Sequence, residues 1–283
     1  MNMHFVKMHG AGNDFVIIDN RALNLSGDAL SALTQRVCTP HTGIGADGLM
    51  AVMPARQGGD YAMLFYNADG SLGEMCGNGA RCICRYGYDH GLAGTAQCVE
   101  TTAGLVTGER LDKTHYRIRL NDPTVLDRRS VRVGDTEYDC RYVELGSPGL
   151  PHAVVLLEDW DSRDPEGLRR LGRHLRFAPA FPKGANVSFV RFIGDDRLKA
   201  VTFERGVEDF TLACGTGCGS IAAALTREGL VSGRDVRIVM PGGELSVSIT
   251  DEAGQIRDIF LTGPTCLVCE GELSEEICRE ANA

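Results

Sequence analysis

The sequence predicts a mixed α/β protein with two pseudo-symmetric domains, each a β-barrel or curved sheet around a central helix. Three observations support this. A length of 283 residues fits two domains better than one. Short strand-like runs outnumber helical runs in both halves. Two similar turns, Cys76-Gly77-Asn78-Gly79 and Cys214-Gly215-Thr216-Gly217, each open a helical run, and they stand 138 residues apart.

Other landmarks repeat at almost the same spacing. Three further pairs share an offset of 138 or 139 and stand before or inside apolar strand-like runs: Asn13 and His152, Asp47 and Asn186, and Phe65 and Phe203. A constant offset across four landmarks indicates an internal duplication of one domain plan.

The elements follow from apolar runs and their flanking residues. The strands expected in the first half are 15–18, 49–52, 62–66, 97–101 and 115–120. In the second half they are 154–157, 187–192, 200–203, 236–240, 245–249 and 259–262. One long helix is expected in each half, 78–90 and 216–228, closed by Gly91 and Gly229.

A domain boundary is expected at the turn residues Asn121-Asp122-Pro123. The N-terminal domain, 1–120, then carries Cys76, and the C-terminal domain, 121–266, carries Cys214. The tail, 267–283, is expected to return to the first domain.

Composition narrows the class of protein. Hydrophobic content of 43% and charged content of 24% are those of a soluble globular chain. A net charge of −9 argues against nucleic acid or an anionic membrane as partner. The start of the chain lacks the pattern of a signal peptide, and no apolar run approaches a membrane span. We therefore expect a cytoplasmic protein whose eleven cysteines are reduced thiols.

Two motifs are only weak evidence for nucleotide or metal binding. Residues 43–48 match the GxGxxG pattern of dinucleotide-binding loops, but a strand rather than a helix is expected after them. Cys266 and Cys269 have CxxC spacing without a second such pair, so we expect core packing and no metal.

The two Cys-Gly-x-Gly turns carry the chemistry. Glycines on both sides of a small polar residue let backbone N–H groups converge on an anion at a helix start. A thiol at that position is expected to have a lowered pKa. Two such thiols facing one carbon would remove a proton from one side and supply a proton to the other, which inverts a stereocentre.

Several long motifs resemble those of diaminopimelate epimerases, from about Lys7 to Gly271. They are Met8-His9-Gly10-Ala11-Gly12-Asn13-Asp14-Phe15, Tyr66-Asn67-Ala68-Asp69-Gly70, Phe181-Pro182-Lys183-Gly184-Ala185-Asn186-Val187, Glu204-Arg205-Gly206, Met240-Pro241-Gly242-Gly243, Leu261-Thr262-Gly263-Pro264 and the two cysteine turns.

The resemblance implies an isomerase without a cofactor that interconverts LL- and meso-diaminopimelate for lysine and peptidoglycan synthesis, often as a homodimer. Its substrate is a small amino acid. It implies that Cys76 and Cys214 are the catalytic bases and that His152 and Glu204 poise them. The residues implied in substrate binding are Asn13, Asn67, Gly77, Asn78, Asn186, Glu204, Arg205, Gly215 and Thr216.

Three positions depart from the family pattern. Leu150 replaces a usual asparagine, Gly48 stands where some members carry glutamine, and Phe210 occupies an often acidic position. A racemase or epimerase for another amino acid, histidine- or proline-like, therefore stays open on the same fold. From other classes, a thiol redox or metal-binding protein built on Cys266 and Cys269 and a non-catalytic amino-acid-binding module also stay open.

Overall fold

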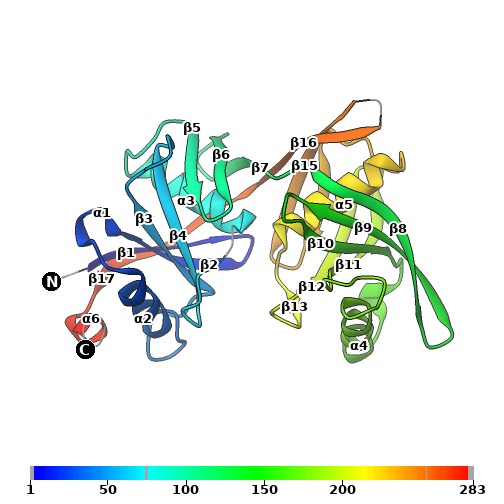
Figure 1. The fold of residues 1–283 in the computed structure, drawn as a ribbon, viewed down its shortest axis with the longest axis horizontal. Coiled ribbons are helices and arrows are strands. Elements are labelled where there is room, and N and C mark those ends of the chain that lie inside the picture. Colours follow the sequence, from blue (N-terminus) through cyan, green and yellow to red (C-terminus); the bar gives the residue numbers. More distant parts are fainter. Residues whose placement is uncertain (1–2, 74–75, 253, 280–283) are drawn as a thin grey trace. The chain divides into compact units, whose positions relative to one another are not determined.

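The computed structural model describes residues 3–73, 76–252 and 254–279, and the chain divides into two compact units. Unit 1 comprises the described residues of Met1–Ile118 and Gly263–Ala283, and unit 2 comprises those of Arg119–Thr262. Figure 1 shows both units.

Unit 1 is a curved sheet around one helix (Figure 1). Strand pairing runs β17-β1-β2-β3-β4-β5-β6-β7, parallel for β2–β3 and β4–β5 and antiparallel elsewhere. The strands are β1 (Met3–Gly10), β2 (Asn13–Asp19), β3 (Gly48–Met53), β4 (Tyr61–Asn67), β5 (Ala96–Thr101), β6 (Gly104–Arg110), β7 (His115–Arg119) and β17 (Cys266–Leu273).

Helices cover both faces of this sheet. The central helix α3 (Gly77–Asp89) is buried along nearly its whole length and packs on the face that carries Met8, Phe15, Met50 and Phe65. On the other face α2 (Gly27–Val37) packs its buried leucines in a second cluster. Two short helices, α1 (Asn20–Leu23) and α6 (Glu275–Arg279), complete the unit.

Unit 2 repeats this plan. Its strands pair in the order β8-β9-β10-β11-β12-β14-β15-β16, and the short β13 also pairs with β12. They are β8 (Pro123–Val133), β9 (Thr136–Leu145), β10 (Leu150–Leu156), β11 (Asn186–Gly194), β12 (Arg197–Phe203), β13 (Phe210–Thr211), β14 (Val236–Met240), β15 (Gly243–Glu252) and β16 (Gln255–Pro264).

The central helix of unit 2 is α5 (Gly215–Arg227), which is buried as α3 is. The opposite face of the sheet is covered by α4 (Pro165–Arg176), whose leucines pack on Tyr142, Phe189 and Phe203. A 3-10 turn, η1 (Trp160–Ser162), precedes α4.

The predicted fold class is confirmed, with two corrections. Each unit has a second long helix, α2 or α4, where one helix was expected. Both begin at clear signals, the caps Ser26 and Asp164, the latter followed by Pro165. The expected correspondence of Phe65 with Phe203 is also wrong, because Phe65 faces α3 while Phe203 faces α4.

The C-terminal strand changes the interpretation of the CxxC motif. Strand β17 pairs with β1 in unit 1, and residues 266–270 are all exposed, so the expected core packing of Cys266 and Cys269 is wrong. Among the described residues no group of three or more His, Cys, Asp or Glu side chains is placed to hold a metal.

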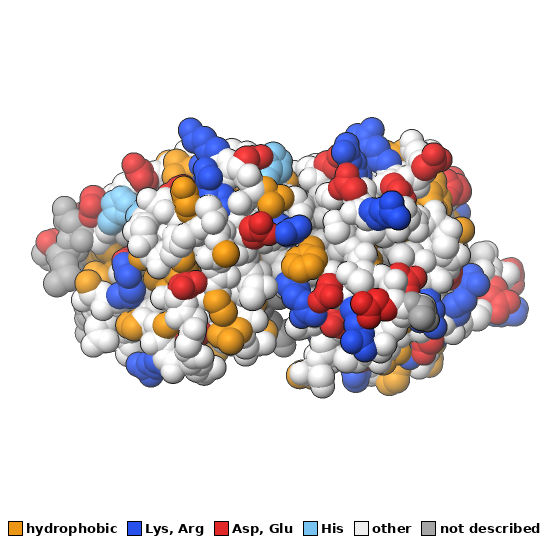
Figure 2. Space-filling model, turned by 90° about the horizontal axis from the view of Figure 1, so that it is seen from above, with side chains coloured by type: hydrophobic (Ala, Val, Ile, Leu, Met, Phe, Trp, Pro, Cys, Tyr) orange, Lys and Arg blue, Asp and Glu red, His pale blue; other side chains and the backbone are white. Residues whose placement is uncertain are grey.

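The surface carries mixed charge. Figure 2 shows acidic and basic side chains interspersed on the face in view, with apolar side chains scattered among them. Many are paired, as Arg191 and Lys199 are with Asp161. None of the helices that the structure describes is long and apolar enough to cross a membrane.

Gly48 has a packing role. A Cβ atom there would lie 2.4 Å from the carbonyl oxygen of Tyr66 and 2.4 Å from the ring of Phe65. We expect Gly48→Ala to lower the free energy of unfolding by about 1–3 kcal/mol, measured by denaturant titration, because backbone must shift to admit the methyl group. Gly94→Ala, whose Cβ would meet no atom within 4 Å, is the matched control. Equal stability of the two variants would contradict this account.

Candidate active site

The thiol of unit 1 stands at the start of α3. Cys76 is the N-cap residue, with an extended backbone (φ −104°, ψ 126°), and its carbonyl accepts the first helical bond from Ala80 at 2.8 Å. The side chain is half-buried. The local sequence produces this turn because Gly77 and Gly79 allow a tight first turn, and Met50 fills the space where a side chain at position 79 would lie.

Asn13 is the polar partner of this thiol. The Sγ atom of Cys76 donates to Oδ1 of Asn13 at 3.2 Å, and Nδ2 of Asn78 approaches the same oxygen at 3.4 Å. The Nδ2 group of Asn13 donates to Asp47 at 2.5 Å. Asn13 and Asn78, both predicted from sequence, therefore meet at Cys76.

The buried Arg81 supports this cluster, although no role for it is predicted from the sequence. Its guanidinium donates to Oδ1 of Asn78 at 2.8 Å and to the carbonyl of Gly77 at 3.3 Å. The carboxamide of Asn78 is thereby oriented with its NH2 group toward Asn13. Asn67 lies apart from these contacts, exposed at the end of β4, and donates to Ser71 at 3.0 Å.

The thiol of unit 2 stands in the same position on α5. Cys214 is the N-cap residue, it is only 5% exposed, and its sulfur lies 3.7 Å from the hydroxyl of Thr216. Burial, followed by the negative charge of Glu204, raises the pKa of Cys214 well above its usual range. Bonds from Thr216 and from the backbone of Gly217 act in the opposite direction. For Cys214 the expected lowering of the pKa is therefore wrong: desolvation outweighs the helix terminus.

Glu204 lies just beyond the end of β12. Its carboxylate accepts a bond from the hydroxyl of Thr211 at 2.5 Å, and its charge acts on Cys214. Glu204, predicted to poise the thiols, and Thr216, predicted to bind substrate, thus both act on Cys214.

His152 is fully buried at the start of β10. Burial, followed by the positive charge of Arg205, lowers the pKa of its imidazole to about 3, so the ring is neutral near pH 7. Oδ1 of Asn186 accepts from the backbone N–H of Arg205 at 2.7 Å, and Nδ2 lies 3.5 Å from Nε2 of His152. The other ring nitrogen, Nδ1, has no hydrogen-bond partner within the described part of the chain.

Arg205 also binds the loop before β11. Its guanidinium donates to the carbonyl of Lys183 at 3.2 Å, and no carboxylate among the described residues pairs with it. His152, Asn186 and Arg205 therefore form one connected group in unit 2.

Phe210 is a packing residue. Its ring meets Phe203 edge-on at 5.6 Å and Phe189 at 6.2 Å, on the α4 side of the sheet. Its departure from the family pattern thus serves the core. Leu150 is half-buried at the first position of β10, opposite Leu145.

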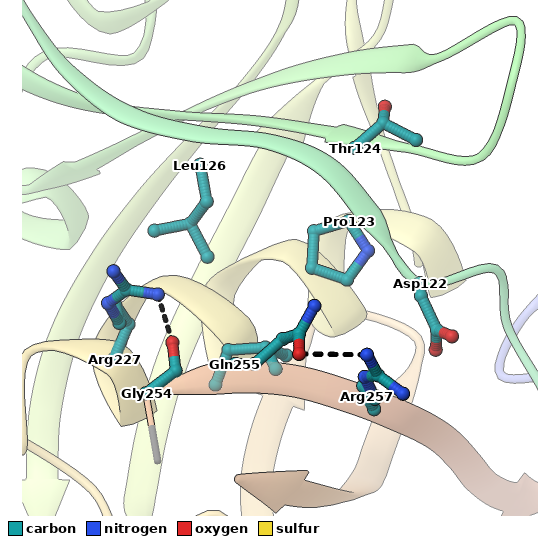
Figure 3. A pocket seen from close by; sticks show the side chains of 9 residues that line it. Asp122, Pro123, Thr124, Leu126, Arg227, Gly254, Gln255 and Arg257 are labelled. Atoms are coloured by element: carbon teal, nitrogen blue, oxygen red, sulfur yellow. Dashed lines mark hydrogen bonds between the residues drawn. The ribbon is translucent and has the colours of Figure 1, made fainter. Parts of the chain in front are cut away.

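A pocket of about 540 Å³ lies elsewhere in unit 2 (Figure 3). It contains none of the predicted site residues and is lined by Asp122, Pro123, Thr124, Leu126, Arg227, Gly254, Gln255, Ile256 and Arg257. In Figure 3 two of its arginines are bonded within the wall, Arg227 to the carbonyl of Gly254 and Arg257 to Gln255.

A duplicated sheet-and-helix plan with a cysteine at the start of each buried helix fits an isomerase of the epimerase class, and the family match shows that class. The chain belongs to the diaminopimelate epimerase family, whose model matches residues 5–125 and 146–268. It is 38% identical to the diaminopimelate epimerase of Aquifex aeolicus, over 97% of this chain and 99% of that protein.

Solved structures share the fold at lower identity. A phenazine biosynthesis protein of the PhzF family from Bacillus anthracis has a TM-score of 0.73 and 13% identity, covering 97% of this chain and 99% of that one. A probable proline racemase from Agrobacterium radiobacter has a TM-score of 0.69 and 17% identity, covering 96% and 93%.

Proposed function

We propose that this protein interconverts LL- and meso-2,6-diaminopimelate without a cofactor, for lysine and peptidoglycan synthesis. The observation that carries the proposal is the pair of thiols, each the N-cap of a buried central helix and each with a polar partner, Asn13 or Thr216. Family membership supports the substrate.

The two thiols act on one α-carbon. One sulfur, as thiolate, takes the proton from the carbon, and the other, as thiol, gives its proton to the opposite face. The carbon leaves inverted, and the two sulfurs have exchanged protonation states. No electron transfer is involved, so the step balances without a redox partner.

The helix starts serve the reacting amino-acid group. Backbone N–H groups at Gly77, Asn78, Gly215 and Thr216 bind its carboxylate, because N–H groups of a first helical turn lack partners in the helix and the helix dipole favours an anion. Glu204 binds the ammonium group, and its charge lies near Cys214.

The remaining polar residues shape the site or hold the distal end of the substrate. Asn13 shapes the site beside Cys76. Asn67, Asn186 and Arg205 serve the distal amino and carboxylate groups, and Arg205 is a cation without a carboxylate partner in the described chain. The neutral His152 acts through hydrogen bonding rather than charge, because its pKa of about 3 leaves it uncharged near pH 7.

A cytoplasmic homodimer completes the proposal. Strand β17 offers an exposed surface that includes Leu267 (39% exposed) and Val268 (51%). Exposed apolar strands of this kind pair readily with a second copy. Sedimentation of the wild type and of Val268→Lys measures the assembly state.

Incubation with LL-diaminopimelate in deuterium oxide tests the reaction. NMR is expected to show deuterium at the α-carbon together with meso product. Exchange with histidine or proline, but none with diaminopimelate, would instead support a racemase for another amino acid. Binding without exchange would indicate a binding module. Stoichiometric metal in the freshly purified protein, or full activity of Cys76→Ala, would favour a role for Cys266 and Cys269.

A further inference from the structure

A chain of polar contacts in unit 1 leads away from Cys76. Asn13 lies between a hydrogen-bond acceptor and a hydrogen-bond donor. Its Nδ2 donates to the carboxylate of Asp47 at 2.5 Å, and its Oδ1 accepts from the thiol of Cys76 at 3.2 Å. The residue farther from the thiol, Asp47, has no role in the chemistry described above.

The carboxylate decides which way the amide points. An ionised carboxylate can only accept hydrogen bonds, whereas a carboxamide has one donating and one accepting end. The NH2 end of Asn13 must therefore face Asp47, which turns the oxygen toward Cys76. The NH2 group of Asn78 is a second donor to Oδ1 of Asn13, because Arg81 binds Oδ1 of Asn78 and so leaves its NH2 group facing Asn13.

Asp47 is itself held in place. Its Oδ2 also accepts from the backbone N–H of Asp14 at 3.1 Å, and its own backbone N–H donates to Oδ1 of Asp14 at 3.0 Å. Lys7 pairs with Asp14 at 2.9 Å and donates to the carbonyl of Gly45. Among the described residues that these contacts join, the charged groups are Asp47, Asp14 and Lys7, with Arg81 on the α3 side.

We propose that Asp47 is a positioning residue that turns the carboxamide oxygen of Asn13 toward Cys76 and so keeps that thiol protonated in the substrate-free protein. An amide oxygen stabilises S–H, which can donate to it, and disfavours S−, which cannot. Were the amide reversed, its NH2 group would stabilise the thiolate instead. The inference rests on the proposed role of Cys76 in epimerisation.

The test is the rate at which iodoacetamide alkylates Cys76 in the full-length protein without substrate, read by mass spectrometry between pH 6 and 9, since only the thiolate reacts. In Asp47→Asn the side chain at position 47 can donate, so Asn13 is free to reverse. We expect Cys76 to react about fivefold faster near pH 7, the factor that matches one hydrogen bond of ordinary net strength. Asn13→Ala is expected to accelerate it similarly.

A double-mutant cycle separates positioning from simple charge. If Asp47 acts through Asn13, Asp47→Asn adds no further acceleration in the Asn13→Ala background. The matched control is Asp69→Asn, an exposed carboxylate in unit 1 that binds Ser71; it should leave Cys76 unchanged. The alkylation rate of half-exposed Cys98 is the internal reference, because an unchanged rate there shows that the reagent concentration and the folding of the variant are unchanged.

An unchanged Cys76 rate in folded Asp47→Asn overturns the proposal, and so does an equal acceleration by Asp47→Asn with and without Asn13. If Asp47→Asn fails to fold, Asn13→Ala alone decides, because an unaltered rate there would show that the amide does not restrain the thiol. Since no substrate is present, these outcomes are independent of whether diaminopimelate is epimerised.

Discussion

Cys214→Ala and Cys76→Ala are each expected to lower kcat/KM for diaminopimelate epimerisation by about three orders of magnitude or more. Inversion needs one sulfur to remove the proton and the other to supply one, and a positioned acid or base contributes about 10²–10⁴ in rate. The measurement is deuterium incorporation at the α-carbon together with the appearance of the other isomer.

Neighbouring cysteines provide matched controls. Cys218 lies one turn further along α5 and Cys82 lies within α3, and both are fully buried. Cys218→Ala and Cys82→Ala remove the same atoms from the same helices, so they should cost some stability while keeping most of the activity. Activity of Cys76→Ala or Cys214→Ala within tenfold of wild type would exclude the two-thiol mechanism.

The activity is expected to rise with pH through neutrality. The reaction needs one thiolate and one thiol, and burial together with Glu204 raises the pKa of Cys214 well above its usual range. A group with a raised pKa keeps its proton up to higher pH, so Cys214 stays a thiol near pH 7. Formation of the single required thiolate is then limited at low pH, where kcat/KM should gain up to about tenfold per pH unit. It should fall only in the alkaline range, when both sulfurs ionise.

Two substitutions should shift the alkaline limb of the pH profile, the range in which kcat/KM falls as both sulfurs ionise, in opposite directions. Glu204→Gln removes the charge that raises the pKa of Cys214, so this limb should shift to lower pH. Thr216→Val removes a hydrogen bond that lowers the pKa, so the limb should shift to higher pH. Shifts in the same direction, or an activity that declines from pH 6 upward, would show that Cys214 does not titrate as described.

Local signals made the central helices predictable. The expected helices 78–90 and 216–228 agree with α3 and α5 to within one residue at each end. The agreement is close because the Cys-Gly-x-Gly turns and the closing glycines mark the helix ends within a few residues of chain. The helices α2 and α4 were missed although Ser26 and Asp164 mark their starts. Strand-like runs are more numerous than helical runs in both halves of the sequence. The helices α2 and α4 each cover the outer face of a sheet, so their place in the fold follows only once that sheet is known.

The direction of side chains was less predictable than their order. A count of eleven residues before each cysteine places Phe65 and Phe203 in register, yet they point to opposite faces of their sheets. Side chains alternate along a strand, so a shift in pairing by an odd number of residues reverses the face, and a count along the chain does not reveal it.

The sequence by itself determined the duplicated plan, the family and the cysteine at the start of each central helix, since these are encoded in short motifs and their spacing. Only the tertiary structure decided how each thiol is held. The burial of Cys214 beside Glu204, and the contact of Asp47 with Asn13 beside Cys76, join residues from separate strands and loops. Desolvation and hydrogen-bond direction depend on these distant neighbours, so the same cysteine turn has a different environment in each unit.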